Sequence, residues 1–350
     1  MTDTHRGPVT IGIDVGGTNL RAGTVDAAGR VHARIDTDTP RAAEDLEDLL
    51  VDTVAALSAA QPADRPVAAV GLAVAGFVSR ERDRVRFAPH LPWRDTAVAD
   101  LLTPRTGLPV FLEHDANSAA WAELVFGPAG EGENVAVVAL GTGVGAALLI
   151  DGRMYRGSTG VAPELGHLPV VPDGRVCPCG KRGCLERYCS GTALAATARE
   201  MLADRPELLP SVLGEIPAEQ IGGVDVARAA ADGDRLARAV MADMAHWLGV
   251  GLSIVADVFD PDLIVVAGGV SASAALFLDD ARRVYAGRVT GAGHRRLARI
   301  RRSELGLDAA LIGAAEVARR GLRAAAEQQG PGADPADPGP TDARNLDRGR

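Results

Sequence analysis

Two glycine-rich turns, each lying between two apolar strand-like segments, constrain the fold of this chain most strongly. The first is Asp14-Val15-Gly16-Gly17-Thr18-Asn19, between Val9–Asp14 and Leu20–Asp26. The second is Leu140-Gly141-Thr142-Gly143-Val144-Gly145, between Val135–Leu140 and Val144–Ile150. Glycines let a backbone approach an anion closely, so each turn taken alone fits either a tight hairpin or a phosphate-binding turn. Two such turns in separate parts of the chain favour phosphate binding by both.

The other apolar patterns predict an α/β protein with two lobes that share a similar plan. Strands are expected at Val31–Asp36, Val67–Val74 and Leu263–Val266, and a helix at Arg41–Ala60. Further helical patterns lie at Thr192–Ala203, Val224–Ala231, Arg235–Phe259, Ala274–Ala286 and Ala309–Ala326. We expect an N-terminal lobe formed by residues 1–116 plus 309–326 and a C-terminal lobe formed by residues 117–308. Residues 328–350 are rich in Pro, Gly, Asp and Arg without apolar spacing, which predicts a disordered tail.

Composition excludes several classes of nucleotide- and nucleic-acid-binding protein. Lys181 is the one lysine of the chain, whereas a P-loop and a protein kinase each need a lysine beside the nucleotide. A dinucleotide fingerprint does not fit at Gly143, because Leu148 stands where a small residue is needed and a strand follows in place of a helix. The net charge of −9 argues against a nucleic-acid partner.

The chain also lacks the apolar patterns of membrane insertion. No apolar run reaches the roughly 18–20 residues of a membrane span, and the N-terminal segment has no apolar signal core. We therefore expect a cytoplasmic protein with no membrane partner.

Several motifs together resemble the ROK family of sugar kinases, over residues 9–325. These are the two glycine turns, Gly76-Phe77-Val78, Glu113-His114-Asp115-Ala116-Asn117, Glu164-Leu165-Gly166-His167, Cys177–Glu186 and Ala267-Gly268-Gly269-Val270-Ser271. The resemblance implies a two-lobed ATPase fold like that of actin and hexokinase, with a central cleft. It also implies ATP with Mg²⁺ as phosphoryl donor and a hexose as acceptor.

The resemblance assigns a role to each motif. Asp115 would accept the proton of the sugar 6-hydroxyl as that oxygen attacks the γ-phosphorus of ATP, a task suited to a carboxylate within hydrogen-bond reach. The alternative is that Asp115 caps the helix expected from Ala116. The residues expected to hold the sugar are Gly76, His114, Asp115, Glu164, His167 and Glu186. Those expected to hold ATP and Mg²⁺ are Asp14, Gly16, Gly17, Thr18, Asn19, Gly141, Thr142, Gly143, Gly268 and Gly269.

Four positions depart from the usual family pattern. His114 and His90 stand where asparagine is common, Ala75 where proline is frequent, and Ala267 where glycine is usual. A neutral histidine can donate one hydrogen bond and accept another. We therefore expect His114 still to contact the sugar, while His90 is equally compatible with a simple loop residue.

A cysteine cluster predicts a structural zinc ion. Cys177, Cys179 and Cys184 with His167 supply three sulfurs and one nitrogen, a complete tetrahedral set that leaves no position open for catalysis. The alternative is a set of reduced cysteines in an ordinary turn. Cys189 is expected to be a buried residue and not a ligand. One zinc ion would fix the positions of Glu164 and Glu186, which flank the cluster.

Rival functions are separated by particular residues. ROK repressors carry a winged helix ahead of the kinase fold, but here the first phosphate turn begins at Asp14. A sensor without catalysis could dispense with Asp115 or the glycine turns, which this chain keeps. Polyphosphate-using glucokinases generally lack the cysteine cluster, so ATP is preferred. Glucose is the favoured sugar because Ala88–Trp93 and Glu113–Asp115 resemble a glucokinase-like branch of the family. Kinases for N-acetylmannosamine, fructose and allose use nearly the same signature and are the alternatives. The family resemblance further implies a homodimer or homotetramer.

Overall fold

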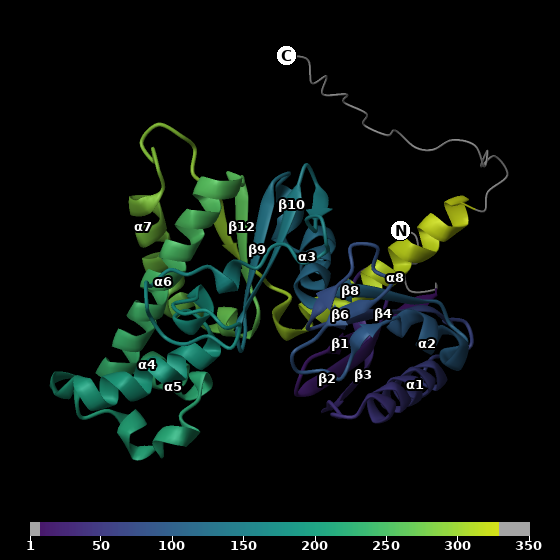
Figure 1. Cartoon of the computed structure of the whole chain (residues 1–350), viewed down its shortest axis with the longest axis horizontal. Coiled ribbons are helices and arrows are strands. Elements are labelled where there is room, and N and C mark those ends of the chain that lie inside the picture. Colours follow the sequence, from purple (N-terminus) through teal and green to yellow (C-terminus); the bar gives the residue numbers. More distant parts are fainter. Residues whose placement is uncertain (1–7, 329–350) are drawn as a thin grey trace, which may run out of the picture.

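The computed structural model describes residues 8–328, which form two α/β lobes placed side by side (Figure 1). Each lobe is built on a five-stranded sheet. The tail expected at residues 328–350 lies outside the described residues, apart from Gln328 at the end of the last helix.

The N-terminal sheet has the strand order β3-β2-β1-β4-β8. Its strands are β1 (Val9–Val15), β2 (Asn19–Val25), β3 (Val31–Asp38), β4 (Val67–Val74) and β8 (Val110–His114). The first three form an antiparallel meander, and β4 and β8 run parallel to β1. Helices α1 (Ala43–Ala59) and α2 (Val98–Thr106) pack their leucines and valines on one face of this sheet.

The C-terminal sheet repeats this plan with the order β11-β10-β9-β12-β13. Its strands are β9 (Val135–Leu140), β10 (Val144–Ile150), β11 (Arg153–Tyr155), β12 (Leu263–Ala267) and β13 (Arg299–Arg302). Again an antiparallel meander is followed by two strands parallel to the first. The expectation of two lobes with a similar plan is therefore confirmed.

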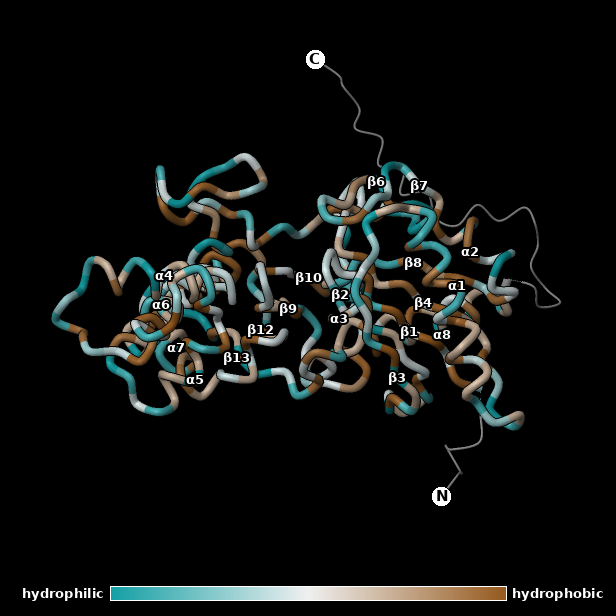
Figure 2. The backbone as a smooth tube through the Cα atoms, turned by 90° about the horizontal axis from the view of Figure 1, so that it is seen from below, coloured by the Kyte–Doolittle hydropathy of each residue, from teal (hydrophilic) through white to brown (hydrophobic). Residues whose placement is uncertain are grey.

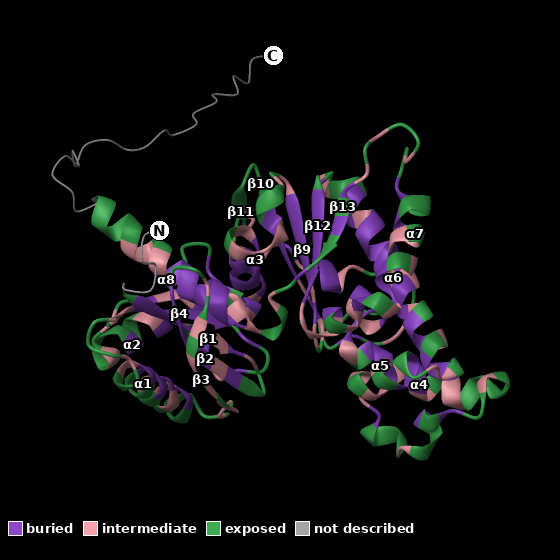
Figure 3. Ribbon diagram, turned by 180° about the vertical axis from the view of Figure 1, so that it is seen from behind, coloured by how far each residue is buried: buried purple, intermediate pink, exposed green. Residues whose placement is uncertain are grey.

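Helices cover the outer face of the C-terminal sheet. They are α4 (Gly191–Asp204), α5 (Gly223–Ala231), α6 (Arg235–Phe259) and α7 (Leu278–Arg288). Together with this face of the sheet they form the largest apolar core. Figure 3 shows the central strands β9 and β12 buried and the outer loops exposed. Figure 2 shows hydrophobic segments following the central strands β1, β4 and β8.

Two helices lie between the sheets and pack against each other. Helix α3 (Asp115–Phe126) covers the inner face of the C-terminal sheet, and α8 (Ala309–Gln328) crosses β1, β4 and β8. Glycines permit the close approach of α8, because a Cβ at Gly12 or Gly71 would lie 1.9 Å from a carbonyl oxygen of that helix. We propose that the lobes divide near residue 116 and that residues 309–326 belong to the N-terminal lobe, since each inner helix covers the sheet of its own lobe.

The structure corrects one helix and adds elements that the sequence did not predict. The helix expected at Ala274–Ala286 is a 3₁₀ segment (Gly269–Leu276) followed by α7, because Phe277 between them is non-helical and buried. The additions include α2, β8, β11, β13 and a small sheet of β5 (Phe77–Val78), β6 (Val85–Phe87) and β7 (Arg94–Thr96). Short 3₁₀ turns occupy Pro128–Glu131, Leu165–His167, Leu185–Arg187, Pro206–Leu208, Val212–Glu215, Ala218–Gln220 and Gly306–Asp308.

Helix α6 is a long apolar helix buried in the C-terminal lobe. Its 25 residues are long and apolar enough to cross a membrane by length and composition, although no single apolar run in the sequence is. In the structure 67% of its apolar window is buried within the chain. This burial is typical of the central helix of a globular core.

Candidate active site

The carboxyl ends of three parallel strands bring the first group of acidic residues together. Register places Asp14 of β1 beside Ala73 of β4, and Ala73 beside Glu113 of β8. Asp115 lies two residues after Glu113 and is the first residue of α3. In open α/β sheets ligands bind outside this edge. Burial raises the pKa of Asp14 to about 7, the negative charge of Asp115 adds to the increase, and Arg21 at 3.7 Å opposes it.

The first glycine turn is held from one side and open on the other. Thr39 donates hydrogen bonds to Gly16 O (2.8 Å) and Thr18 O (2.9 Å), while Gly17, Thr18 and Asn19 are exposed. A Cβ at Gly17 would lie 2.4 Å from Cβ of His90, so His90 packs directly against the turn. From the sequence, His90 was equally compatible with a site residue and with a simple loop residue. In the structure it lies beside the expected phosphate turn.

The second glycine turn is held by the beginning of α4. Gly191 donates its N–H to Gly141 O at 2.8 Å, and Thr192 Oγ1 donates to Thr142 O at 2.7 Å. Gly268 adjoins the same turn, because a Cβ there would lie 2.5 Å from Leu140 O. Gly269 follows it at the start of the 3₁₀ segment. The expected nucleotide-binding glycines of the C-terminal lobe therefore lie together.

The expected sugar-binding residues converge on Asp115 from several segments. His114 Nε2 lies 3.0 Å from Asp115 Oδ1. Burial raises the pKa of Glu164, the positive charges that His114 and His167 can carry lower it, and the negative charges of Asp115 and Glu186 raise it further. Glu186 reaches the second turn, because a Cβ at Gly143 would lie 2.6 Å from its Oε2. His167 lies between the two carboxylates of the C-terminal lobe, with its ring nitrogens 3.7 Å from Glu164 Oε2 and 3.6 Å from Glu186 Oε1.

Two residues of the expected sugar site make informative local contacts. Asp115 does not act as the N-cap of α3, because His114 takes that position and Asp115 Oδ1 accepts the adjacent Ala116 N–H at 2.7 Å. Gly76 packs against its own chain, since a Cβ there would lie 2.7 Å from Cβ of Ala88 and 2.8 Å from Phe87 O. The close approach that requires glycine at position 76 is therefore to the small sheet, whether or not a sugar lies nearby.

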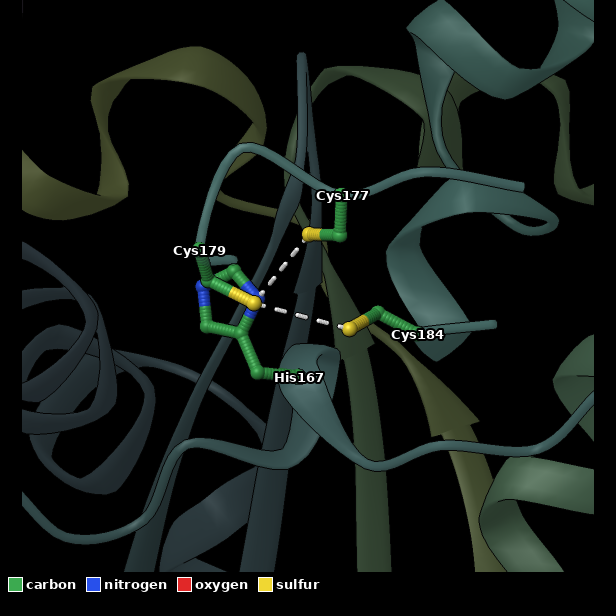
Figure 4. A group of neighbouring side chains, drawn as sticks. All are labelled: His167, Cys177, Cys179 and Cys184. Carbon is green, nitrogen blue, oxygen red and sulfur yellow. Dashed lines mark hydrogen bonds between the residues drawn. The ribbon is translucent and has the colours of Figure 1, made fainter. Parts of the chain in front are cut away.

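The cysteine cluster has the geometry of a metal site (Figure 4). Cys177 Sγ lies 3.6 Å from His167 Nδ1, and Cys179 Sγ lies 3.6 Å from Cys184 Sγ. The four ligand atoms all lie within 4.8 Å of one another. A tetrahedral zinc ion with Zn–S bonds of about 2.3 Å needs ligand separations of about 3.8 Å. The sulfur–sulfur distance also exceeds that of a disulfide, so the residues present fit a zinc ion.

Other residues near the site were not identified from the sequence as contributors. Arg21 pairs with Asp14 across the β1–β2 hairpin, and Arg156 pairs with the buried Glu113 immediately before His114. Glu113 lies within the motif Glu113–Asn117, but the sequence assigned it no role of its own. Arg156 carries no local signal, because its partner is 43 residues away in the chain.

Comparison with known proteins identifies the family. The family model described as "ROK family" matches residues 10–321. The chain belongs to the ROK family. It is 38% identical to a glucokinase of Streptomyces coelicolor over 313 residues, covering 89% of this chain and 98% of that protein. A putative xylose repressor of Caldicellulosiruptor is 31% identical over 239 residues, covering 68% of this chain and 59% of the repressor.

The solved structures agree with the fold of this ROK protein. A ROK glucokinase of Streptomyces griseus in complex with glucose and AMPPNP has a TM-score of 0.81 and 39% identity, covering 89% of this chain and 99% of that chain. The expected two-lobed ATPase fold is thereby confirmed.

Proposed function

We propose that this ROK protein transfers the γ-phosphoryl group of ATP to the 6-hydroxyl of a hexose, with glucose as the favoured substrate. The observation that carries the proposal is the convergence of Asp115, His114, Glu164 and Glu186 beside two glycine turns from opposite lobes. Similarity to glucokinases over almost their full length supports the choice of sugar.

Asp115 is proposed to act as the general base. As the sugar O6 forms a bond to the γ-phosphorus, the bond from that phosphorus to the leaving oxygen of ADP breaks, and the O6 proton passes to the Asp115 carboxylate. His114 and Glu164 would hold other hydroxyls in fixed directions, and a sugar that lacks one of them would leave a partly buried polar group unpaired. Backbone N–H groups of the two turns would bind the phosphates.

Asp14 would hold Mg²⁺ through its hydration shell. The chemistry of the site fits a cation there, because burial and the negative charge of Asp115 raise the pKa of Asp14 to about 7, and a bound cation would offset both effects. When bound, Mg²⁺ would neutralise charge on the ATP phosphates. The zinc ion is proposed to be structural, with His167, Cys177, Cys179 and Cys184 as ligands.

Replacement of the base tests this assignment. We predict that Asp115→Asn retains glucose binding while kcat falls by about 10²–10⁴, the usual contribution of a general base. Binding by titration calorimetry and turnover with ATP measure the two quantities separately. A variant that turns over at nearly the wild-type rate would show that Asp115 is not the base.

A donor and acceptor panel tests the substrate. Glucose, N-acetylmannosamine, fructose and allose are each assayed with ATP and with polyphosphate. The proposal expects the highest kcat/KM for glucose with ATP. Sugar binding without turnover of any acceptor would instead favour a sensor, a role consistent with the repressors among the relatives.

A further inference from the structure

A buried ion pair links the segment of the proposed base to the segment of a proposed sugar ligand. Glu113 is only 1% exposed and accepts hydrogen bonds from Arg156, which is 17% exposed. Arg156 reaches it with two nitrogens, Nε at 3.4 Å from Oε1 and a second at Oε2. This two-point contact between arginine and carboxylate fixes orientation as well as distance.

Glu113 also binds the chain on both sides of Asp115. Its Oε1 accepts the backbone N–H of His114 at 3.2 Å and the side-chain amide of Asn117 at 3.1 Å. Asp115 therefore lies between two residues that the same carboxylate holds. Arg82 is a weaker partner, with a nitrogen 3.7 Å from Oε2 and a half-exposed side chain.

Arg156 in turn begins the segment that carries Glu164. This segment follows β11 and leaves the C-terminal sheet to contact the N-terminal lobe. Gly160, with a φ of +95°, lies so close to Val78 that a Cβ would be 2.3 Å from that residue's carbonyl oxygen. Arg156 and Glu164 line one hollow of about 370 Å³. A change at Arg156 would thus act on the segment that carries Glu164 and, through Glu113, on the residues on both sides of Asp115.

We propose that Arg156 and Glu113 form a positioning pair that aligns the base Asp115 with the sugar ligand Glu164. This inference rests on the proposed hexose kinase function and assigns neither residue a contact with substrate. A displacement of about 1 Å at the reacting atoms can cost about 10²-fold in rate. The pair should therefore affect kcat, and glucose affinity as well, through geometry.

A double replacement separates positioning from stability. Removal of one partner alone, in Glu113→Gln or Arg156→Met, leaves an uncompensated buried charge and lowers stability, whereas the double replacement leaves no such charge. The amide oxygen of a glutamine at position 113 can still accept the hydrogen bonds from His114 and Asn117. We expect the double variant Glu113→Gln/Arg156→Met to regain most of the wild-type thermal midpoint. Its kcat for glucose should nevertheless stay about 10-fold or more below wild type, with weaker glucose binding by calorimetry. Arg156→Lys keeps the charge without the two-point contact and should give an intermediate kcat.

Arg84→Met provides the matched control, because Arg84 is an arginine of the neighbouring β5–β6 hairpin that pairs with Asp83 and Asp95 at the surface. Its kcat should change less than about twofold, as is usual for an exposed ion pair. A double variant with restored stability and wild-type kcat and glucose affinity would overturn the positioning role. Absence of hexose phosphorylation by the wild type would refute the proposed function instead, and the calorimetric comparison would still decide whether the pair shapes the sugar site.

Discussion

Glu123 gives the sharpest prediction about stability. It lies on α3, is fully buried, and accepts a hydrogen bond from Ser303 Oγ, while its Oε2 has no partner among the described residues. Burial raises the pKa of Glu123 to about 7, the Ser303 hydrogen bond lowers it, and the charge of Glu304 raises it. The folded protein therefore holds a proton at Glu123 that the unfolded chain releases near its ordinary pKa.

The sign of the pH dependence follows from that difference. Between the unfolded pKa of about 4.5 and the folded pKa of about 7, the unfolded state binds fewer protons at Glu123. The free energy of unfolding must then fall as pH rises through this window. Over the range from about pH 5.5 to about pH 8.5 the loss from this one group is on the order of 2 kcal/mol.

Glu123→Gln should remove this loss without changing the shape of the side chain. The amide oxygen can still accept the Ser303 hydrogen bond, and an amide does not ionise in this range. We expect urea unfolding at pH 5.5 and pH 8.5 to show a decrease for the wild type about 2 kcal/mol greater than for the variant. The control is Glu133→Gln, at an exposed carboxylate, which should retain the wild-type slope. Equal slopes in wild type and Glu123→Gln would refute the assignment of a protonated Glu123.

Two further predictions concern the zinc site and acid stability. Cys179→Ser should lower the zinc content from one ion per chain to much less, and with it the thermal stability and the glucose affinity, because a structural zinc ion contributes directly to folding. Cys189→Ser is the control and should keep its metal. Elemental analysis that finds full zinc in Cys179→Ser would refute the ligand set. Burial would raise the pKa of Asp26, but hydrogen bonds from His32, Arg30 and Ala28 lower it to about 2. Its stabilisation should therefore be complete above the unfolded pKa of about 3.8 and disappear as pH falls toward 2. Asp26→Asn should then cost about 2 kcal/mol at pH 7 and progressively less below about pH 4 in denaturant titrations. A constant difference between wild type and Asp26→Asn across this range would argue against the depressed pKa.

The sequence predicted those parts of the fold that depend on local patterns. Strands β1, β2, β3, β4, β9, β10 and β12 and helices α1, α4, α5, α6 and α8 have regular apolar spacing, and their bounds were close to those observed. The break before α7 was missed, because Phe277 continues the apolar pattern while its backbone leaves the helix. Strand β13 was missed because three of its four residues are arginines at a sheet edge. Its place depends on pairing with β12 and not on its own composition.

The candidate site divides in the same way. Asp115, the glycine turns and the cysteine cluster lie in compact motifs, so their residue types and spacing suffice to predict them. The contacts of Arg156 with Glu113 and of His90 with Gly17 join segments far apart in the chain. Such contacts depend on how distant segments are folded together and, for Arg156 and Glu113, on how the two lobes meet, and no period or spacing in a single segment encodes that arrangement.

The substitution of histidine for the usual asparagine at position 114 has a structural consequence for the proposed base. Within residues 8–328 the polar contacts of the Asp115 carboxylate fall on Oδ1, which lies 2.7 Å from the Ala116 nitrogen and 3.0 Å from His114 Nε2. In the tautomer that carries its proton on Nε2, His114 can donate to Oδ1, as an asparagine amide could. Oδ1 then holds the orientation of the carboxylate, and Oδ2 is left to accept the proton of a sugar hydroxyl. We infer that histidine at position 114 is compatible with a base at Asp115, because it replaces the one feature of asparagine that orientation of the carboxylate requires, a hydrogen-bond donor.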